Sequence, residues 1–454
     1  MKYLLSICLF LILYCEVTKA QTYANIAGPE NVLVVYNTNS DTSRYVKDYY
    51  VNARNIPSIN ICALDTLPED TTITYQGVTH TIEIVGWGDI IRDNNQAMSD
   101  TPTFHAWKYF LDFIATPIRN YLIDNNLQET IRYIVICKGV PWKIQGKYNG
   151  GGSGYSANGN IPIDGLLCML NTDNYDSYIE NSVYPGGYQS NPYYNADPNY
   201  TFNYRFLPDH FTSGNHKLSY LVSHIDGPTY QTVVDIIDRS VNADKSGTGV
   251  WILDDDYCFP TYTTLHQQFT NTKQKLESFG FNVAYNNTNT WITHNTYQGG
   301  GSIMGYSSWG THAEDGDCEW SDSAYVVDSL QFQYANGAIF NTFESFNGTG
   351  LTHLTWRNVT TIPPDCHHTQ GLLAQFPIVG GTCGVAHAWE PDGELINLDK
   401  YFPSYAMGYS VVDAAYLGMH SEKHLFSIRI REALSLPILI VIAVLFEKNR
   451  IVVT

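Results

Sequence analysis

The chain has 454 residues, of which 44% are hydrophobic, 14% aromatic and 15% charged. This composition excludes a disordered polypeptide and a coiled coil, because both carry more charge and less apolar material. The formal net charge is -19, from 25 Lys and Arg against 44 Asp and Glu. An acidic protein repels phosphate backbones, so we expect no nucleic-acid partner.

The first twenty residues have the three parts of a secretory signal peptide. A basic start at Lys2 precedes an apolar run from Leu4 to Tyr14, and Ala20 ends a short polar stretch. The apolar run is too short to span a bilayer as a helix. We therefore predict a cleaved signal peptide over residues 1–20 and a secreted, extracellular protein.

Secretion has two covalent consequences. Nine cysteines become seven once Cys8 and Cys15 leave with the signal peptide, and in an oxidising compartment some of the seven should form disulfides. Cys62 and Cys137 lie in apolar, strand-like runs, so we expect them to be buried and inert. Four Asn-x-Ser/Thr triplets are candidate glycosylation sites. They begin at Asn199, Asn286, Asn347 and Asn358.

Strand-like and helical patterns alternate through the rest of the chain. Buried strands are predicted at 32–36, 59–64, 133–137, 249–253, 282–285, 303–306 and 338–340. Helices are predicted from about 41 to 55, over 107–122 with a kink or break at Pro117, after Asp226–Pro228, and over 262–279. This repetition predicts an α/β fold, a three-layer sandwich in which helices cover both faces of a mostly parallel, doubly wound sheet.

Residues 147–215 interrupt the alternation with a segment rich in Tyr, Asn, Gly and Pro. A loop of this length is either an ordered functional insertion or a mobile lid. Its tyrosines carry apolar area with a polar end, which favours order. We therefore predict a single large domain over residues 21–430 that contains this insertion.

Residues 431–454 form an apolar C-terminal segment. Its core, Leu434–Phe446, is interrupted by Pro437 and is followed by charged residues. The core is shorter than the roughly 20 residues that a spanning helix needs. Its β-branched residues favour a buried edge strand. Membrane association through residues 434–446 is the alternative.

Ligands of parallel sheets bind at the carboxyl ends of the strands. This rule selects Lys138, which follows the strand at 133–137, and Asp254, Asp255 and Asp256, which follow the strand at 249–253. Adjacent acids typically cap helices and face water. The alternatives are a calcium site, or one acid that orients a partner group.

Soft donor groups are present but not at the spacings of known metal sites. Cys383 and His387 are four residues apart in a strand-like stretch, and Cys366 stands beside two histidines in a Pro-rich loop. Neither group has a second pair at a recognised spacing. We therefore expect no metal and no cofactor.

Several motifs between about Asn31 and Tyr416 resemble a little-characterised family of secreted α/β proteins. They are Asn31–Asn37, Lys138–Pro141, Asp226–Pro228, Gly305–Gly310, Gly337–Ile339 with Glu344–Phe346, and Glu390–Pro391. That family in turn resembles the gingipain-type cysteine peptidases, which implies a caspase-like fold.

The resemblance also implies where a catalytic dyad would lie. In gingipain-type enzymes a His-Gly follows one strand, and a nucleophilic Cys with a Gly three residues later follows the next. These positions fall on Trp309-Gly310 and on Ser345, with Gly348 after it. An indole cannot accept a proton, and a serine hydroxyl without a base is unreactive. The resemblance therefore implies a divergent or inactive peptidase-like hydrolase homologue.

Two other functions fit the sequence. One is an active hydrolase that uses Ser345 or Glu344, with His312 as a substitute base. The other is an extracellular carbohydrate- or protein-binding module built on the tyrosine-rich insertion. The expected partner is accordingly an extracellular protein or polysaccharide.

Overall fold

The computed structural model describes most of the chain between residues 28 and 419. The described residues are 28–85, 90–96, 103–145, 160–183, 191, 194, 212–213, 216–217, 219–244, 246, 248–255, 261–288, 290–310, 325–344, 347–348, 373–387 and 395–419. The predicted signal peptide, the C-terminal segment and most of the insertion lie outside these residues. Among the described helices, none has the length and apolar character needed to cross a membrane.

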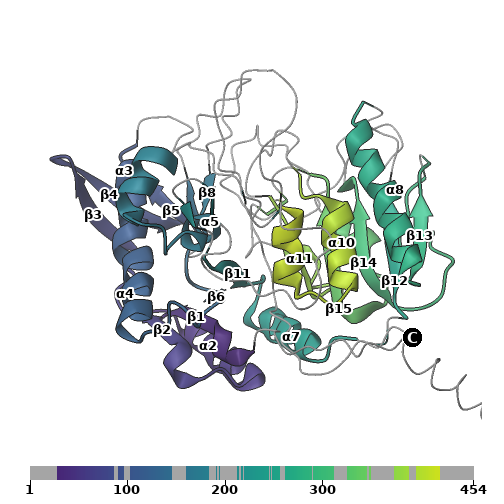
Figure 1. Cartoon of the computed structure of the whole chain (residues 1–454), viewed down its shortest axis with the longest axis horizontal. Coiled ribbons are helices and arrows are strands. Elements are labelled where there is room, and N and C mark those ends of the chain that lie inside the picture. Colours follow the sequence, from purple (N-terminus) through teal and green to yellow (C-terminus); the bar gives the residue numbers. More distant parts are fainter. Residues whose placement is uncertain are drawn as a thin grey trace, which may run out of the picture.

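A first parallel sheet, the N-terminal sheet, has the strand order β11-β6-β1-β2 (Figure 1). Its strands are β1 (Val32–Asn37), β2 (Ile61–Leu64), β6 (Tyr133–Cys137) and β11 (Leu221–Ile225). Every side chain of β6 and β11 is buried, as expected for parallel strands that are covered on both faces. Helix α2 (Asp41–Arg54) follows β1 and begins at the N-cap Ser40.

A second parallel sheet, the C-terminal sheet, has the strand order β13-β12-β14-β15-β16. Its strands are β12 (Val250–Asp254), β13 (Asn282–Asn286), β14 (Ile303–Ser308), β15 (Tyr334–Thr342) and β16 (Cys383–Gly384). Helix α8 (Thr263–Ser278) connects β12 to β13. Helix α10 (Leu398–Ala406) packs on β12 through the rings of Phe402 and Trp251, whose centroids are 5.2 Å apart.

A third, mixed sheet has the strand order β3-β4-β5-β7-β8. Its strands are β3 (Asp70–Tyr75), β4 (Val78–Val85), β5 (Ile90–Asp93), β7 (Lys143–Gln145) and β8 (Asn160–Pro162). Gln76 and Gly77 connect β3 to β4 with φ of 48° and 80°, the two positive values that a tight type I′ hairpin turn requires. Helix α3 (Phe104–Phe110) packs on this sheet.

Shorter elements complete the described part. They are α5 (Ile163–Cys168), α6 (Tyr175–Tyr178), β9 (Thr212–Ser213), β10 (His216–Lys217), α9 (Tyr325–Ser329) and α11 (Val411–Gly418), with 3-10 turns at Pro29–Asn31, Ser58–Asn60 and Leu373–Gln375 and a π-helical turn at Ile179–Val183. Elements β8, α5 and α6 belong to the predicted insertion, so part of that segment is regular structure.

Helices α7 (Tyr230–Val241) and α11 join the two parallel sheets into one body (Figure 1). Arg54 of α2 donates to Ser240 of α7 at 2.7 Å. Tyr133 of β6 donates to Asp413 of α11 at 2.8 Å. Both contacts are buried, so the C-terminal helices are anchored to the N-terminal sheet.

The predicted fold class is confirmed, because the chain is mixed α/β with mostly parallel strands. The parallel strands divide into two sheets, however, and the mixed sheet was not predicted. Pro117 does not break the helix predicted over 107–122. The helix runs as α3, a π-helical turn at Leu111–Ala115, and α4 (Thr116–Asp124), so the irregular turn lies directly before Pro117, which has no N–H to donate.

The four described cysteines form no disulfide. Cys62, Cys137, Cys168 and Cys383 are all buried and free. The burial of Cys62 and Cys137 is as predicted. The cysteines at positions 258, 318 and 366 lie outside the described residues, so the expectation that some cysteines pair stays a prediction.

Gly305 of β14 gives a test of the packing between α10 and the C-terminal sheet. A Cβ atom at this position would lie 2.4 Å from Cε3 of Trp251 and 3.2 Å from Cε2 of Phe402. We predict that Gly305→Ala lowers the free energy of unfolding by about 1–3 kcal/mol, the usual cost of overpacking. Urea unfolding measures this change. Gly300→Ala is the matched control, since no atom lies within 4 Å of the added Cβ; equal midpoints for the two variants would contradict the packing.

Candidate functional site

The carboxyl edge of the C-terminal sheet gathers the polar residues that follow β12, β14 and β15. Asp254 pairs in register with Ser308, and Ser308 pairs with Thr342. Asp255, Trp309 and the segment that leads to Glu344 therefore leave three neighbouring strands at the same edge. In parallel sheets this edge is where ligands bind, so it is the candidate site.

Asp255 is the centre of this edge. Its side chain is buried, and the residue is only 4% exposed. Oδ1 accepts hydrogen bonds from Nδ1 of His266 at 2.6 Å and from Nε1 of Trp309 at 3.1 Å, and Oδ2 accepts one from the hydroxyl of Tyr285 at 3.2 Å. Burial raises the pKa of Asp255, while these donors oppose the rise by stabilising the carboxylate.

His266 lies in the first turn of α8 and is a candidate site residue that sequence reasoning missed. Its side chain is 18% exposed, and its ring centroid is 5.0 Å from that of Trp309. Donation from Nδ1 to Asp255 selects the tautomer in which Nε2 is the acceptor. A buried acid that orients an imidazole in this way is the arrangement that a general base requires. The sequence could have indicated this residue, because His266 lies near the start of the helix predicted over 262–279, which follows the acids at the end of the preceding strand.

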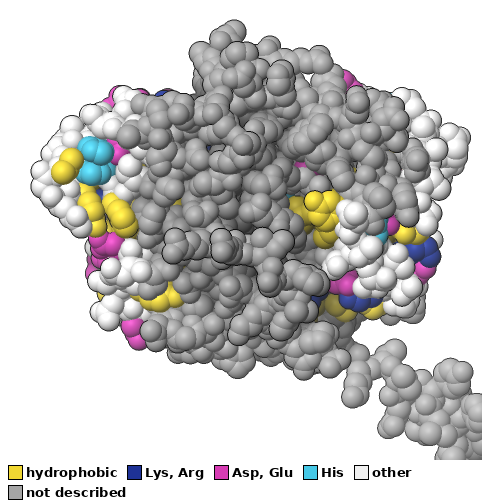
Figure 2. Space-filling view, turned by 90° about the horizontal axis from the view of Figure 1, so that it is seen from above, with side chains coloured by type: hydrophobic (Ala, Val, Ile, Leu, Met, Phe, Trp, Pro, Cys, Tyr) yellow, Lys and Arg dark blue, Asp and Glu magenta, His cyan; other side chains and the backbone are white. Residues whose placement is uncertain are grey.

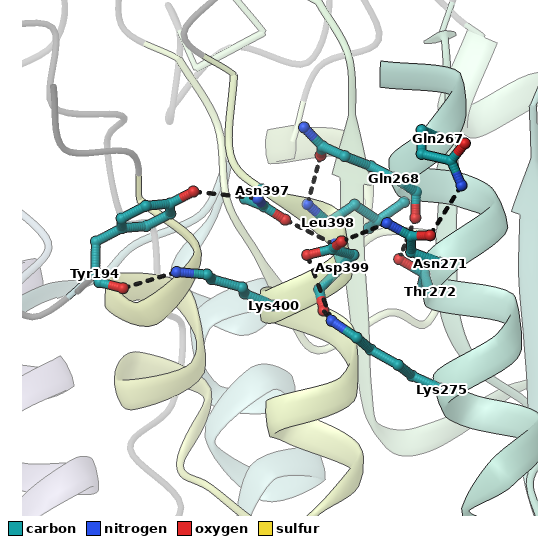
Figure 3. A network of polar contacts seen from close by, with 10 residues as sticks. All are labelled: Tyr194, Gln267, Gln268, Asn271, Thr272, Lys275, Asn397, Leu398, Asp399 and Lys400. Carbon is teal, nitrogen blue, oxygen red and sulfur yellow. Dashed lines mark hydrogen bonds and ion pairs between the residues drawn. The ribbon is translucent and has the colours of Figure 1, made fainter. Parts of the chain in front are cut away.

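Contacts with α10 fix the position of α8, and therefore of His266 (Figure 3). Oε1 of Gln268 accepts from the backbone N–H of Leu398 at 2.9 Å, and Nδ2 of Asn271 donates to Asp399 at 2.9 Å. Nζ of Lys275 donates to the backbone oxygen of Asp399 at 2.8 Å. The three α8 side chains lie on one helix face, three and four residues apart, and all meet the first turn of α10.

Trp309 occupies the position where the resemblance to gingipain-type peptidases implies a histidine. It is 2% exposed and packs against the rings of Phe343 and Phe269, at centroid distances of 5.5 and 6.3 Å. Its single N–H donates to Asp255. The indole is therefore a buried structural donor that cannot take a proton from a nucleophile.

Glu344 is buried beneath the turn that follows β14. It is 1% exposed, and a Cβ atom on Gly310 would lie 2.0 Å from its carboxyl group. Gly310 also has φ of 69°, a left-handed conformation that favours glycine. The carboxyl group of Glu344 thus lies directly against the backbone, which leaves it little access to a substrate.

His387 and Asn347 close the edge beyond β15. Oδ1 of Asn347 accepts from the backbone N–H of His387 at 2.6 Å, and its Nδ2 donates to Oγ1 of Thr342 at 2.8 Å. Nδ1 of His387 donates to the backbone oxygen of Glu344 at 2.8 Å. Burial lowers the pKa of His387 to about 4, so its imidazole is neutral. Cys383 and His387 belong to a strand and the residues after it, not to a helix, and among the described residues they do not form part of a cluster of three metal-ligand side chains.

The acidic run after β12 differs from the expectation of water-facing carboxylates. Asp254 and Asp255 are both buried, because each carboxylate accepts hydrogen bonds from within the protein. Asp254 accepts from Nδ2 of Asn286 at 2.7 Å and from the backbone N–H of Ile292 at 2.8 Å, so it holds the loop after β13. Asp255 orients a partner group, one of the alternatives that the sequence left open. Asp256 lies outside the described residues.

Lys138 belongs to a different place in the fold. It follows β6 at the carboxyl edge of the N-terminal sheet, where its Nζ is 2.8 Å from Oδ1 of the buried Asp226. It is therefore not part of the cluster around Asp255. Ser345 and His312, the other predicted catalytic residues, lie outside the described residues.

Two of the four candidate glycosylation sites are described. Asn347 is buried, with both ends of its amide engaged, so a glycan there would require this loop to open. Asn286 is half-buried, and its Nδ2 donates to Asp254 and to the backbone oxygen of Thr290. Asn199 and Asn358 lie outside the described residues.

Comparison with known proteins gives one distant likeness. No family model matches the chain, and no curated protein matches it. Among solved structures, the Arg-specific cysteine proteinase gingipain R is similar, with 10% sequence identity and a TM-score of 0.39. The alignment covers 86% of this chain and 72% of that chain. A likeness of this size concerns the arrangement of the chain and carries no argument about activity.

The buried imidazole of His387 predicts a pH dependence of stability. The pKa of this histidine falls from its ordinary value of 6.5 to about 4 on folding, so below pH 6.5 the unfolded chain binds a proton that the folded protein does not. The stabilisation is complete above pH 6.5 and is lost as the pH falls from 6.5 towards 4, by about 3 kcal/mol in all. Urea unfolding across this range should show that the stability difference between the wild type and His387→Gln shrinks as the pH falls. Parallel curves would contradict this account.

Proposed function

We propose that this protein is a secreted, glycosylated, peptidase-like protein that does not act as a cysteine peptidase. The observation that carries the proposal is Trp309. At the position where a gingipain-type enzyme would have its imidazole, the chain has a buried indole whose only polar hydrogen is donated to Asp255. A thiolate mechanism needs a neighbouring base, and this position cannot provide one.

The described thiols support the same conclusion. Burial raises the pKa of Cys62 and of Cys168 to about 12, and it raises the pKa of Cys137 and Cys383 strongly as well. A cysteine reacts as the thiolate, which needs an exposed and electropositive environment. None of the four described cysteines has such an environment.

A second candidate function, hydrolysis by a serine, is favoured by the pair of Asp255 and His266. In this mechanism Nε2 of His266 takes the proton of the Ser345 hydroxyl as Oγ attacks an acyl carbonyl carbon. The proton then passes to the leaving group, whose bond to the acyl carbon breaks, and water releases the acyl group. His266 would serve as the base in place of His312, and the buried Glu344 would have no catalytic part.

The first candidate function predicts a lack of thiol-dependent proteolysis. The purified secreted protein, incubated with an electrophilic peptidyl probe for cysteine peptidases, should remain unlabelled, and in a mixed peptide library it should show no cleavage that a thiol-blocking reagent abolishes. Trp309→His should not create activity, because the new imidazole would be buried against Asp255 and the phenylalanine rings. Labelling of a folded wild-type protein at a cysteine, with matching peptide cleavage, would overturn the proposal.

A fluorophosphonate probe for activated serines tests the second candidate. Labelling at Ser345 that disappears in Ser345→Ala and falls by about 10²–10⁴-fold in His266→Gln would establish the hydrolase, since this is the usual contribution of a general base. His294→Gln is the matched control, because His294 lies in the loop before β14 and donates to the backbone oxygen of Ser329. Absence of labelling in the wild type would exclude this candidate and leave the first one standing.

A further inference from the structure

A second polar cluster lies on the mixed sheet, separate from the edge that carries Asp255. His80 of β4, Asp93 at the end of β5 and His105 of α3 each place one ligand atom within 4.8 Å of the others. The two imidazole rings are stacked, with centroids 3.7 Å apart. The side chain of His80 is 21% exposed while that of Asp93 is fully buried. Figure 2 shows histidine side chains at the surface of the part of the molecule that carries β3 and β4.

The buried carboxylate of Asp93 organises this cluster. Its Oδ2 accepts from Nδ1 of His80 and from Oγ1 of Thr103, both at 2.6 Å, and its Oδ1 accepts from the backbone N–H of Asn95 at 2.8 Å. Thr103 is also the N-cap of α3, since its hydroxyl accepts from the backbone N–H of Ala106. Asp93 therefore ties the start of α3 to the end of β5 and brings His105 beside His80.

His105 is oriented by the backbone of β4. Its Nε2 is 3.0 Å from the backbone oxygen of Val78, to which it donates, so Nδ1 carries the lone pair. Metal-binding imidazoles are commonly held in this way, with one ring nitrogen bonded to a carbonyl and the other facing the ion. The ring is nearly buried, so its orientation is also fixed by packing.

We propose that His80, Asp93 and His105 bind one divalent transition metal ion, with Zn²⁺ as the best match. Two imidazoles and one carboxylate are the donor set that zinc favours, whereas Ca²⁺ and Mg²⁺ prefer oxygen donors alone. Ligand atoms around a tetrahedral zinc lie about 3.3 Å apart, given metal–nitrogen distances of about 2.0–2.1 Å. The three donor atoms lie within 4.8 Å of one another, and Nδ1 of His80 is 2.6 Å from Oδ2 of Asp93, so the ion would replace this hydrogen bond with a bond to each group. Three protein ligands would leave a fourth position of a tetrahedral ion open.

The proposal departs from the sequence-based expectation that no metal is bound. That expectation rested on spacing, and these residues come from two strands and a helix with no recognised spacing between them. The cluster has a simpler interpretation, an ion pair between His80 and Asp93 that only stabilises the mixed sheet. The experiment must separate the two.

Cobalt titration of the metal-free, full-length protein tests the site. Co²⁺ should give the visible absorption of a tetrahedral site at one equivalent, and Zn²⁺ should displace it. His80→Gln and His105→Gln should each weaken binding by well over tenfold, and Thr103→Val, which removes a contact to the ligand Asp93, by about 10–100-fold. His294→Gln should bind as the wild type does. Circular dichroism confirms that each variant is folded.

Thermal unfolding gives an independent readout. Zn²⁺ should raise the melting temperature of the wild type and of His294→Gln, because an ion that binds only the folded state stabilises it, and should not raise that of the two ligand variants. The proposal is overturned if the wild type shows no tetrahedral cobalt spectrum, or if folded His80→Gln and His105→Gln bind as tightly as the wild type. Either result would leave the ion pair as the only role of the cluster.

Discussion

The buried carboxylate of Asp255 is the interaction on which the edge of the C-terminal sheet depends. Burial of a carboxylate is costly unless donors compensate for the water that it loses. Here the donors come from α8, β13 and the end of β14, through His266, Tyr285 and Trp309. One side chain at the end of β12 thus ties four elements together, and loss of any donor would leave part of this charge without compensation.

In a gingipain-type cysteine peptidase, the residue that follows the strand is also the histidine that acts as the base. In this chain the residue after the strand and the imidazole are different side chains. The residue after β14 is an aromatic anchor, packed against Phe343 and Phe269, and it supplies only a hydrogen-bond donor. The imidazole comes from α8 instead and approaches the same carboxylate beside the indole. Among the described residues, this edge therefore presents an oriented histidine and no cysteine, which is why we propose a protein without cysteine-peptidase activity and, as the second candidate, a serine hydrolase.

The parallel strands could be predicted because each is a continuous apolar run, as in β6 and β12. The hairpin of β3 and β4 could not, since exposed threonines alternate along it and Ile73 is its only buried residue on β3. Helix α10 was also missed, although it sets the position of α8. The burial of Asp255 could not be inferred locally, because Trp309 and Tyr285 are 54 and 30 residues away in sequence. The cluster of His80, Asp93 and His105 could not be predicted for the same reason, because these residues are apart in the sequence and come together only in the folded mixed sheet.

The position of the proton on the His266 ring most directly tests the claim that Asp255 orients this imidazole. Nitrogen-15 NMR of the histidine-labelled protein distinguishes the two imidazole tautomers and detects the proton on Nδ1. The account predicts that His266 carries this proton on Nδ1, protected from exchange, in the wild type. Asp255→Asn should abolish both the protection and the tautomer preference. Asp112→Asn, which removes a carboxylate paired with Lys108 in another part of the fold, should leave them intact. A ring with its proton on Nε2 in the wild type, or one that is indifferent to the Asp255 substitution, would contradict it.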